Sequence, residues 1–140
     1  MTNRAIWTVA AGLRASLVGS VLALTLGAPQ AQVVVICHPS TTLSADDVRD
    51  VFLGEKQLAG AVKLQPVDNA AEQAGFLSKF LAMEPAKYSS AWAKKAFRDG
   101  VTAPPVKASD SDVVDFVKRT PGGVGYVKSA PAGVNVVTQK

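Results

Sequence analysis

The stretch TPGGVGY, residues 120–126, places three glycines in four positions, behind a proline and ahead of an aromatic residue. Glycine-rich loops that bind phosphate follow a strand and open a helix, so that backbone N–H groups face the anion. Here the order is reversed, because a helical pattern ends at Thr120, Pro121 prevents its continuation and an apolar run begins at Val124. The stretch therefore predicts a tight helix-to-strand turn, in which the glycines permit positive φ and Gly125 allows close backbone approach.

The segments on either side of this turn carry matching signals. Ser109 and Asp112 have the spacing of a helix N-terminal pair, and the helix that follows has an apolar face formed by Val113, Phe116 and Val117. After the turn, residues 124–127 and 134–137 are rich in valine, which predicts two strands.

The first half of the chain after residue 32 begins with a strand and a capped helix. Residues 33–37 form a continuous apolar run, typical of a strand buried on both faces. Ser44 and Asp47 form a capping-box pair, and Gly54 is a natural stop for the helix between them. The apolar face of that helix is formed by Val48, Val51 and Phe52.

The middle of the chain predicts one strand and two helices, with a loop at residues 55–60. Residues 62–67 are expected to form the strand, with Pro66 near its end, and Asp68 or Asn69 is expected to cap the next helix, Asn69 pairing with Glu72. The apolar stripe of that helix is Phe76, Leu77, Phe80 and Leu81. A further helix is expected from Pro85 to Arg98, with a core-facing side formed by Tyr88, Trp92, Ala93, Ala96 and Phe97. Strands alternating with helices predict an α/β fold, a small mixed sheet flanked by about four helices.

The first 31 residues have the order of a secretory signal peptide. Arg4 and Arg14 both precede a short apolar run at 15–26. A segment of small and helix-breaking residues follows at 27–31. The run is shorter than the roughly 20 residues of a membrane span. We expect residues 1–31 to be removed on export and residues 32–140 to form a single periplasmic domain. An uncleaved leader that anchors the protein to the membrane is the alternative.

Charge and cysteine content exclude several classes of function. Loss of the two leader arginines lowers the 15 basic residues to 13, against 11 acidic ones, and no basic cluster follows any segment, so nucleic acid is not an expected partner. The single cysteine, Cys37, rules out an intramolecular disulfide and is expected to be buried, with His38 on the opposite face. One histidine and one cysteine without ligand spacing predict no metal site, and no cofactor is expected.

Catalysis is not expected, although acidic residues recur in pairs. They lie at the starts of predicted helices, where carboxylates cap the helix or interact with its dipole: Asp46, Asp47, Asp50, Asp110, Asp112 and Asp115. No nucleophile, base and orienting residue form a recognisable set.

Three stretches taken together resemble a known family. In this order and spacing, LSADDVRDVFLGE, FLAMEPAKYSSAWAKKAFRDGVTAPP and VVDFVKRTPGGVGYV are similar to the substrate-binding proteins of phosphate-type ABC transporters. The resemblance covers residues 34–127. It implies one lobe of the class II periplasmic-binding-protein-like fold, an exported protein without enzymatic activity. A full receptor of that family has two lobes, with the anion bound in the cleft between them.

The resemblance also implies where a ligand would bind. In the family, the strand before the second helix ends in Arg, Asp and Gly-Ser-Gly-Thr, whose arginine, N–H groups and hydroxyls hold the anion. This chain has Gln65 to Gln73 there, without the arginine or the Ser-Gly-Thr donors, and Glu72 adds a like charge. The candidate ligand-binding residues are Asp68, Asn69 and Gln73, and we expect weak phosphate binding by this lobe alone.

Two functions follow from these features. In the first, the protein is a solute-binding module or transport accessory, whose ligand is a small anion or another solute. In the second, it is a structural or protein-interaction module of the cell envelope that has lost ligand binding and docks an envelope protein or a second copy of itself.

Overall fold

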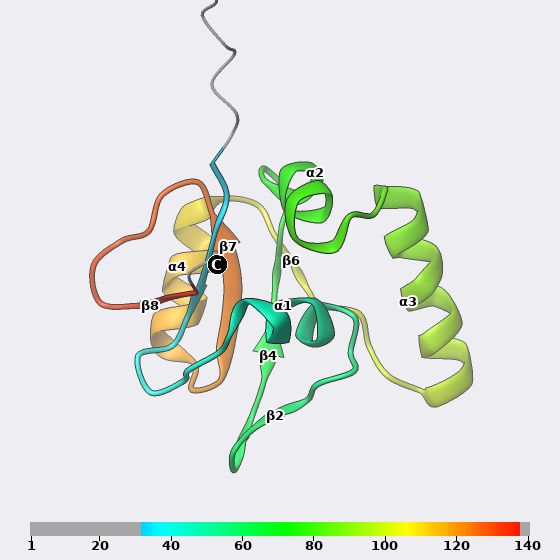
Figure 1. Cartoon of the computed structure of the whole chain (residues 1–140), viewed down its shortest axis with the longest axis horizontal. Coiled ribbons are helices and arrows are strands. Elements are labelled where there is room, and N and C mark those ends of the chain that lie inside the picture. The colour runs from blue at the N-terminus through cyan, green and yellow to red at the C-terminus, as the bar shows by residue number, and fades with distance from the viewer. Residues whose placement is uncertain (1–31, 138–140) are drawn as a thin grey trace, which may run out of the picture.

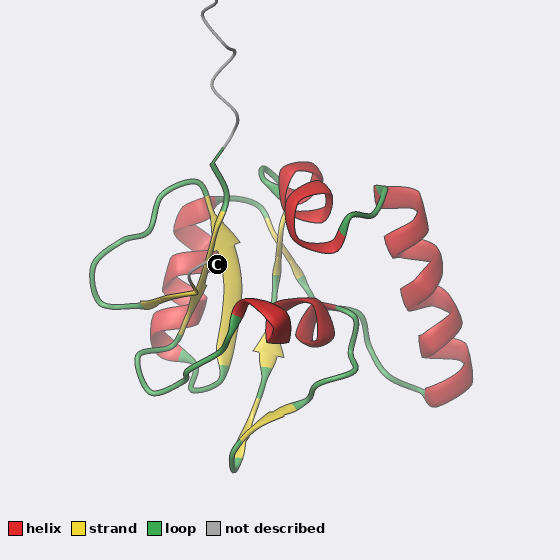
Figure 2. Ribbon diagram, in the orientation of Figure 1, coloured by secondary structure: helices red, strands yellow, loops and turns green. Residues whose placement is uncertain are grey.

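The computed structural model of this 140-residue chain describes residues 32–137, which form a mixed α/β fold (Figures 1 and 2). This confirms the expected fold class, an α/β fold with a small mixed sheet flanked by about four helices. The predicted signal peptide, residues 1–31, lies outside the described residues. No helix within 32–137 has the length and apolar character needed to cross a bilayer.

The central sheet has the strand order β4-β7-β1-β8. Strand β1 (Val34–Cys37) runs antiparallel to both β7 (Gly123–Val127) and β8 (Asn135–Val137). On the other side of β7, β4 (Gln65–Pro66) pairs with it in parallel. Directly after β4, β5 (Asp68–Asn69) pairs in parallel with β6 (Val106–Lys107). The chain from β4 to β5 therefore passes from the central sheet to a separate two-stranded ladder.

Two helices begin with the caps that the sequence predicts. In α1 (Ala45–Phe52), the Ser44 hydroxyl accepts from the Asp47 N–H while the Asp47 carboxylate accepts from the Ser44 N–H, so the capping box is confirmed. In α4 (Asp110–Arg119), the Ser109 hydroxyl accepts from the Asp112 N–H. Helix α4 covers one face of the sheet, whereas α1 packs against the other.

The predicted turn at residues 120–126 is confirmed. Helix α4 ends at Arg119 and β7 begins at Gly123, with Gly122 at φ +80° between them. A Cβ on Gly122 would collide with the backbone carbonyl of Lys63, and one on Gly125 would collide with Val113. The turn therefore needs Gly122 for its positive φ and Gly125 for close packing. It follows the C-terminal end of α4, so no helix N-terminus faces a ligand at this turn.

The region between residues 55 and 82 differs from the prediction. The expected loop and strand form a small hairpin, β2 (Leu58–Ala59) and β3 (Val62–Lys63), before β4. The expected Asn69–Glu72 cap is wrong: Asn69 belongs to β5, and α2 (Gln73–Phe76) starts after Glu72 without a side-chain cap. Helix α2 continues as the π-helical η1 (Leu77–Leu81), which ends at Ala82 with φ +49°. The helix starts later than predicted because residues 68–69 pair with β6 as a strand. The partner residues are 38 positions further along the chain, and local capping patterns carry no information about them.

Helix α3 (Pro85–Asp99) lies at the outer end of the molecule (Figure 1). Its start at Pro85 and its end at Gly100, which has φ +68°, follow the sequence prediction. Tyr88 and Trp92 are buried as expected, but Ala93, Ala96 and Phe97 are exposed, and Phe97 is 95% exposed. The core-facing stripe was therefore predicted too wide, since only one narrow side of α3 meets the body.

The core on the α1 side is built around aromatic rings. The Tyr126 ring of β7 stacks on Phe76 with centroids 3.9 Å apart, and Phe52 meets Phe76 edge-on at 4.7 Å. Cys37 is buried in this cluster, as predicted, and its thiol donates to the Thr41 carbonyl at 3.1 Å. Burial raises the pKa of the Cys37 thiol, which keeps it protonated and unreactive.

Candidate functional site

Asp68, the first predicted ligand residue, lies inside the fold and is only 2% exposed. Strand β5 directs its carboxyl group between two tyrosines, whose hydroxyls donate to it: Tyr88 of α3 at 2.9 Å and Tyr126 of β7 at 2.9 Å. The carboxyl group therefore links α3 to the central sheet and does not face solvent.

Burial sets the ionisation of this group. Removal from water raises the pKa of the Asp68 carboxyl, although the two tyrosine hydroxyls act in the opposite direction. Burial, followed by the negative charge of Asp68, also raises the pKa of Tyr88, and the same two causes raise the pKa of Tyr126. The tyrosines thus remain hydrogen-bond donors to Asp68 over the whole physiological pH range.

Asn69, the second predicted residue, is fully buried and its side-chain amide is engaged internally. Its Nδ2 donates to the Asp110 carboxylate at 2.6 Å and to the Tyr126 carbonyl at 3.0 Å, while its Oδ1 accepts from the Ala71 N–H. The Lys128 N–H donates to the other oxygen of Asp110 at 3.0 Å. The Asp110 carboxylate, in the first turn of α4, therefore already occupies the donors that an external anion would need.

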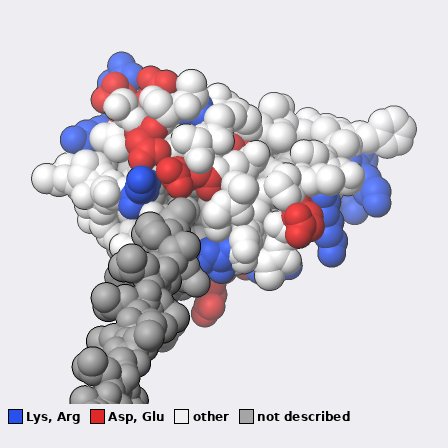
Figure 3. Space-filling model, turned by 90° about the horizontal axis from the view of Figure 1, so that it is seen from above, with Lys and Arg blue, Asp and Glu red and all other residues white. Residues whose placement is uncertain are grey.

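Gln73, the third predicted residue, opens α2 and is half-buried. Figure 3 looks onto this edge of the molecule, where several acidic side chains gather over the α4 half with basic ones among them. The acidic residues at the two helix starts include Glu72, Asp110 and Asp112. Asp68 and Asn69 are consecutive residues of β5, and both are engaged by internal partners that leave no free donor pair for an anion.

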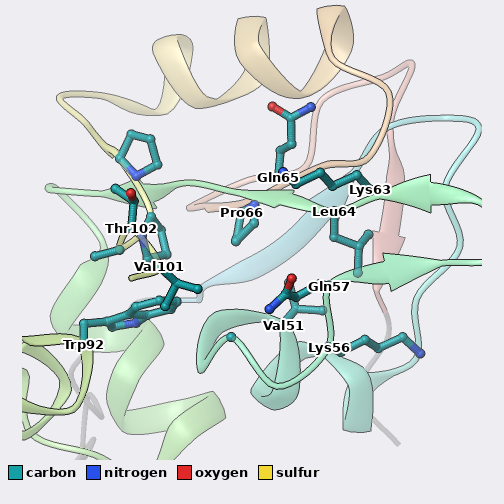
Figure 4. A pocket seen from close by; sticks show the side chains of 14 residues that line it. Val51, Lys56, Gln57, Lys63, Leu64, Gln65, Pro66, Trp92, Val101 and Thr102 are labelled. Carbon is teal, nitrogen blue, oxygen red and sulfur yellow. The ribbon is translucent and has the colours of Figure 1, made fainter. Parts of the chain in front are cut away.

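A different region of the molecule is hollow. A cleft of about 380 Å³ lies between α3 and the following loop on one side, and α1, β3 and β4 on the other (Figure 4). It is lined by Val51, Gly54, Lys56, Gln57, Lys63, Leu64, Gln65, Pro66, Trp92 and residues 101–105. Lys63 and Leu64 directly precede β4, and residues 101–105 directly precede β6, so the cleft lies beside the amino ends of these two strands. The predicted ligand residues lie further along the chain, in β5 and α2.

The two sides of the cleft differ in chemistry. Trp92 and Val101 provide an apolar wall, and Gln57 reaches toward them from the facing side (Figure 4). The indole is fixed, because its Nε1 donates to the Phe52 carbonyl at 3.0 Å and its ring edge lies over Gly54. Among residues 32–137, no ion pair engages Lys63, whereas Lys56 is paired with Asp47 at 2.8 Å.

Sequence reasoning missed this cleft. It predicted the burial of Trp92 correctly, but placed the residues that face it in a plain loop and strand. Gln57, Lys63 and Thr102 come from segments 45 residues apart at most, and no local pattern connects them. The one available signal was the run of prolines at 104–105, which predicts an ordered wall without predicting what it faces.

Comparisons with known proteins do not assign the chain. No protein-family model matches it, and no curated protein matches it either. Among the residues that the structure describes, no three histidine, cysteine, aspartate or glutamate side chains lie together in a way that could hold a metal ion.

Proposed function

We propose that the protein is an exported, periplasmic and non-enzymatic binding module, a single-lobe relative of the substrate-binding proteins of phosphate-type ABC transporters. It binds a small solute or acts as a transport accessory. The observation that carries this proposal is the cleft beside Trp92, which combines an apolar wall with exposed polar groups on a rigid frame. A cavity of this size falls in the range of small-molecule sites, which are mostly apolar with a few placed polar groups.

Oxyanion binding at residues 68–73 is the less supported form of this function. An oxyanion there would have to displace the Asp110 carboxylate from Asn69 and from the Lys128 N–H. It would also approach the buried Asp68 carboxyl without a compensating arginine. We therefore place the solute in the cleft beside Trp92.

The test is to express the full chain with its leader, recover it by osmotic shock and examine it by native mass spectrometry. We expect the protein in the periplasmic fraction, shortened by about 31 residues, in complex with a co-purified small molecule. Calorimetric titration with phosphate and sulfate should show no saturable heat at millimolar anion. A protein that stays in the cytoplasm, or that carries no small molecule and binds none of a broad solute panel, would contradict the proposal.

A structural or protein-interaction module is the second candidate. It is favoured by large apolar side chains that are more than half exposed on three separate elements: Leu58, Phe97 and Val106. Such side chains mark interaction surfaces when they cluster. Light scattering of the purified protein distinguishes the two functions, because a monomer with a bound solute supports the first, and a stable assembly with an empty cleft supports the second.

A further inference from the structure

Two lysines border the cleft beside Trp92, but neither directs its charge into it. Lys56 turns away toward Asp47, whose carboxylate it binds at 2.8 Å (Figure 4). Lys63 leaves its strand on the face opposite Leu64, because successive side chains of an extended chain alternate, and Figure 4 shows it pointing away from the Trp92 ring. No aspartate or glutamate of the described residues lines the cleft. The side chains that face its interior are therefore uncharged.

The interior of the cleft is apolar. Trp92, Val51 and Leu64 are buried where they line it, and Pro66 and Val101 are half-buried. Apolar atoms of a ligand gain free energy by leaving water for such a surface. An ion placed there would lose its hydration without gaining an opposite charge. The cleft therefore disfavours ions of either sign.

Prolines keep the two walls of the cleft apart. Strand β5 pairs with β6, and the Asp68 N–H donates to the Pro105 carbonyl at 2.8 Å. Toward their amino ends, the same two segments carry Pro66 on one side and Pro104 and Pro105 on the other, and these residues have no N–H group that could extend the ladder. No backbone hydrogen bond joins the two segments there. The separation of the walls therefore follows from the prolines.

Gln57 supplies a polar group at the border of the apolar interior. Its side chain is exposed, faces the Trp92 wall (Figure 4) and makes no hydrogen bond to another described residue. The exposed hydroxyl of Thr102 lines the same cleft and is likewise unused. By contrast, the Asn69 amide makes three internal hydrogen bonds. A carboxamide is neutral and carries both an acceptor oxygen and N–H donors, so Gln57 can pair with an amide or a hydroxyl group of a ligand.

We propose that the cleft binds a small uncharged solute, with an apolar ring or branched chain against Trp92 and an amide or hydroxyl group at Gln57. This inference rests on the proposed function as a binding module and names the chemical class of its solute. The apolar body of the solute fills the uncharged interior, and its neutral polar group bonds to the neutral amide of Gln57. An ion of the same shape lacks a partner of opposite charge.

Trp92 is the natural reporter for this site. The chain has two tryptophans, so the substitution Trp7→Phe in the full chain leaves Trp92 as the single fluorophore. The three probes share one apolar ring and differ in charge at neutral pH: cyclohexanecarboxamide, cyclohexanecarboxylate and cyclohexylmethylammonium. None of them absorbs where tryptophan does. We expect a saturable change in Trp92 fluorescence with the carboxamide, at a Kd of about 1 mM or tighter.

The charge of the probe should weaken binding whatever its sign. We expect the carboxylate and the ammonium probe each to bind about tenfold more weakly than the carboxamide, because neither finds an opposite charge in the cleft. Binding of the carboxamide should not weaken at about 1 M salt, since salt screens only charges. Equal binding of all three probes, or tighter binding of either ion, would overturn the assignment of an uncharged solute. The same conclusion follows if the carboxamide gives no saturable response.

A new charge at position 57 locates the bound probe. Gln57→Glu places a carboxylate beside the ligand, so we expect the ammonium probe to gain about fivefold in affinity and the carboxylate probe to lose about as much. Gln65→Glu is the matched control, because its exposed side chain points away from Trp92 (Figure 4), and it should leave all three affinities unchanged. Affinities that Gln57→Glu leaves unaltered, or that Gln65→Glu shifts as much, would overturn the placement of the ligand at Gln57.

The outcome is separable from the proposed function. A small molecule found by native mass spectrometry, together with no response to cyclohexanecarboxamide, would reject the uncharged solute class and leave the binding module standing. The absence of both would reject both.

Discussion

The two ends of the β4–β5 segment show opposite ways of using polar residues. In β5, Asp68 and Asn69 are buried, and every buried side-chain nitrogen and oxygen within residues 32–137 has a hydrogen-bond partner. Before β4, Gln57 is exposed beside an apolar cavity. The first region uses polar groups to hold elements together, and the second leaves them free for a ligand. A residue type that suits a ligand therefore indicates a binding site only where its donors are unoccupied.

The strongest test of this comparison is the removal of the Asp68 carboxyl. Asp68→Ala leaves the hydroxyls of Tyr88 and Tyr126 buried without an acceptor, so we expect the free energy of unfolding to fall by about 3 kcal/mol, as measured by urea denaturation. The solute binding proposed for the cleft should persist under native conditions, because Asp68 does not line the cleft.

The matched control is Asp68→Asn, which keeps the shape and one acceptor oxygen. It should cost about 1 kcal/mol, the value of a typical hydrogen bond. If Asp68→Ala proves no less stable than Asp68→Asn, the two tyrosines are not held by this group and the structural role assigned to Asp68 is wrong.

A second test uses the pH dependence of stability, in which an exposed carboxylate, Asp47, and the buried Asp68 should differ. Asp47, whose hydrogen bond from Lys56 and cap with Ser44 lower its pKa to about 2, should stabilise the fold above the usual value near 4. This contribution is lost as the pH falls from about 4 to about 2. Since the Asp47 side chain is 27% exposed, we expect this contribution to the free energy of unfolding to be about 1 kcal/mol. In Asp47→Asn, the free energy of unfolding measured with urea should therefore fall less steeply with decreasing pH in this acid range.

The pH dependence of stability that arises from Asp68 should have the opposite sign. Burial raises its pKa, so the native state binds the proton more tightly than the unfolded state, and stability falls as the pH rises above about 4. Relative to the unsubstituted protein, Asp68→Asn should therefore lose the least free energy of unfolding at neutral pH and the most in acid. An identical pH profile in both proteins would show that Asp68 is not shielded from water.

The smallest effect is expected at Phe97. Because this ring is 95% exposed, Phe97→Ser should change the free energy of unfolding by less than about 0.5 kcal/mol. Tyr88→Phe, on the same helix, should cost about 1 kcal/mol by removing the hydrogen bond to Asp68. A large loss in Phe97→Ser, dependent on protein concentration, would instead reveal that Phe97 is covered in an assembly.

Local signals predicted a substantial part of the fold. The Ser44–Asp47 capping box, Pro85 at the start of α3, and the glycine turn after α4 each act within a few residues, and each is found as predicted. Predictions failed where a distant partner decides the structure. Asn69 resembles a helix cap locally, yet pairing with Lys107 and bonding to Asp110 place it in a strand. Phe97 fits a helical stripe, yet no neighbouring element reaches it.

The candidate site shows the same division. The amino-acid sequence by itself determined the order of the four helical segments, the strands β1, β7 and β8, and the glycine turn, because steric limits and capping bonds act between near neighbours. Only the tertiary structure decided which polar groups are occupied. It brought Asp110 to Asn69 and two tyrosines to Asp68, and it left Gln57 exposed beside an open cleft. Whether a donor is free depends on every element that packs around it, which no short stretch of sequence contains.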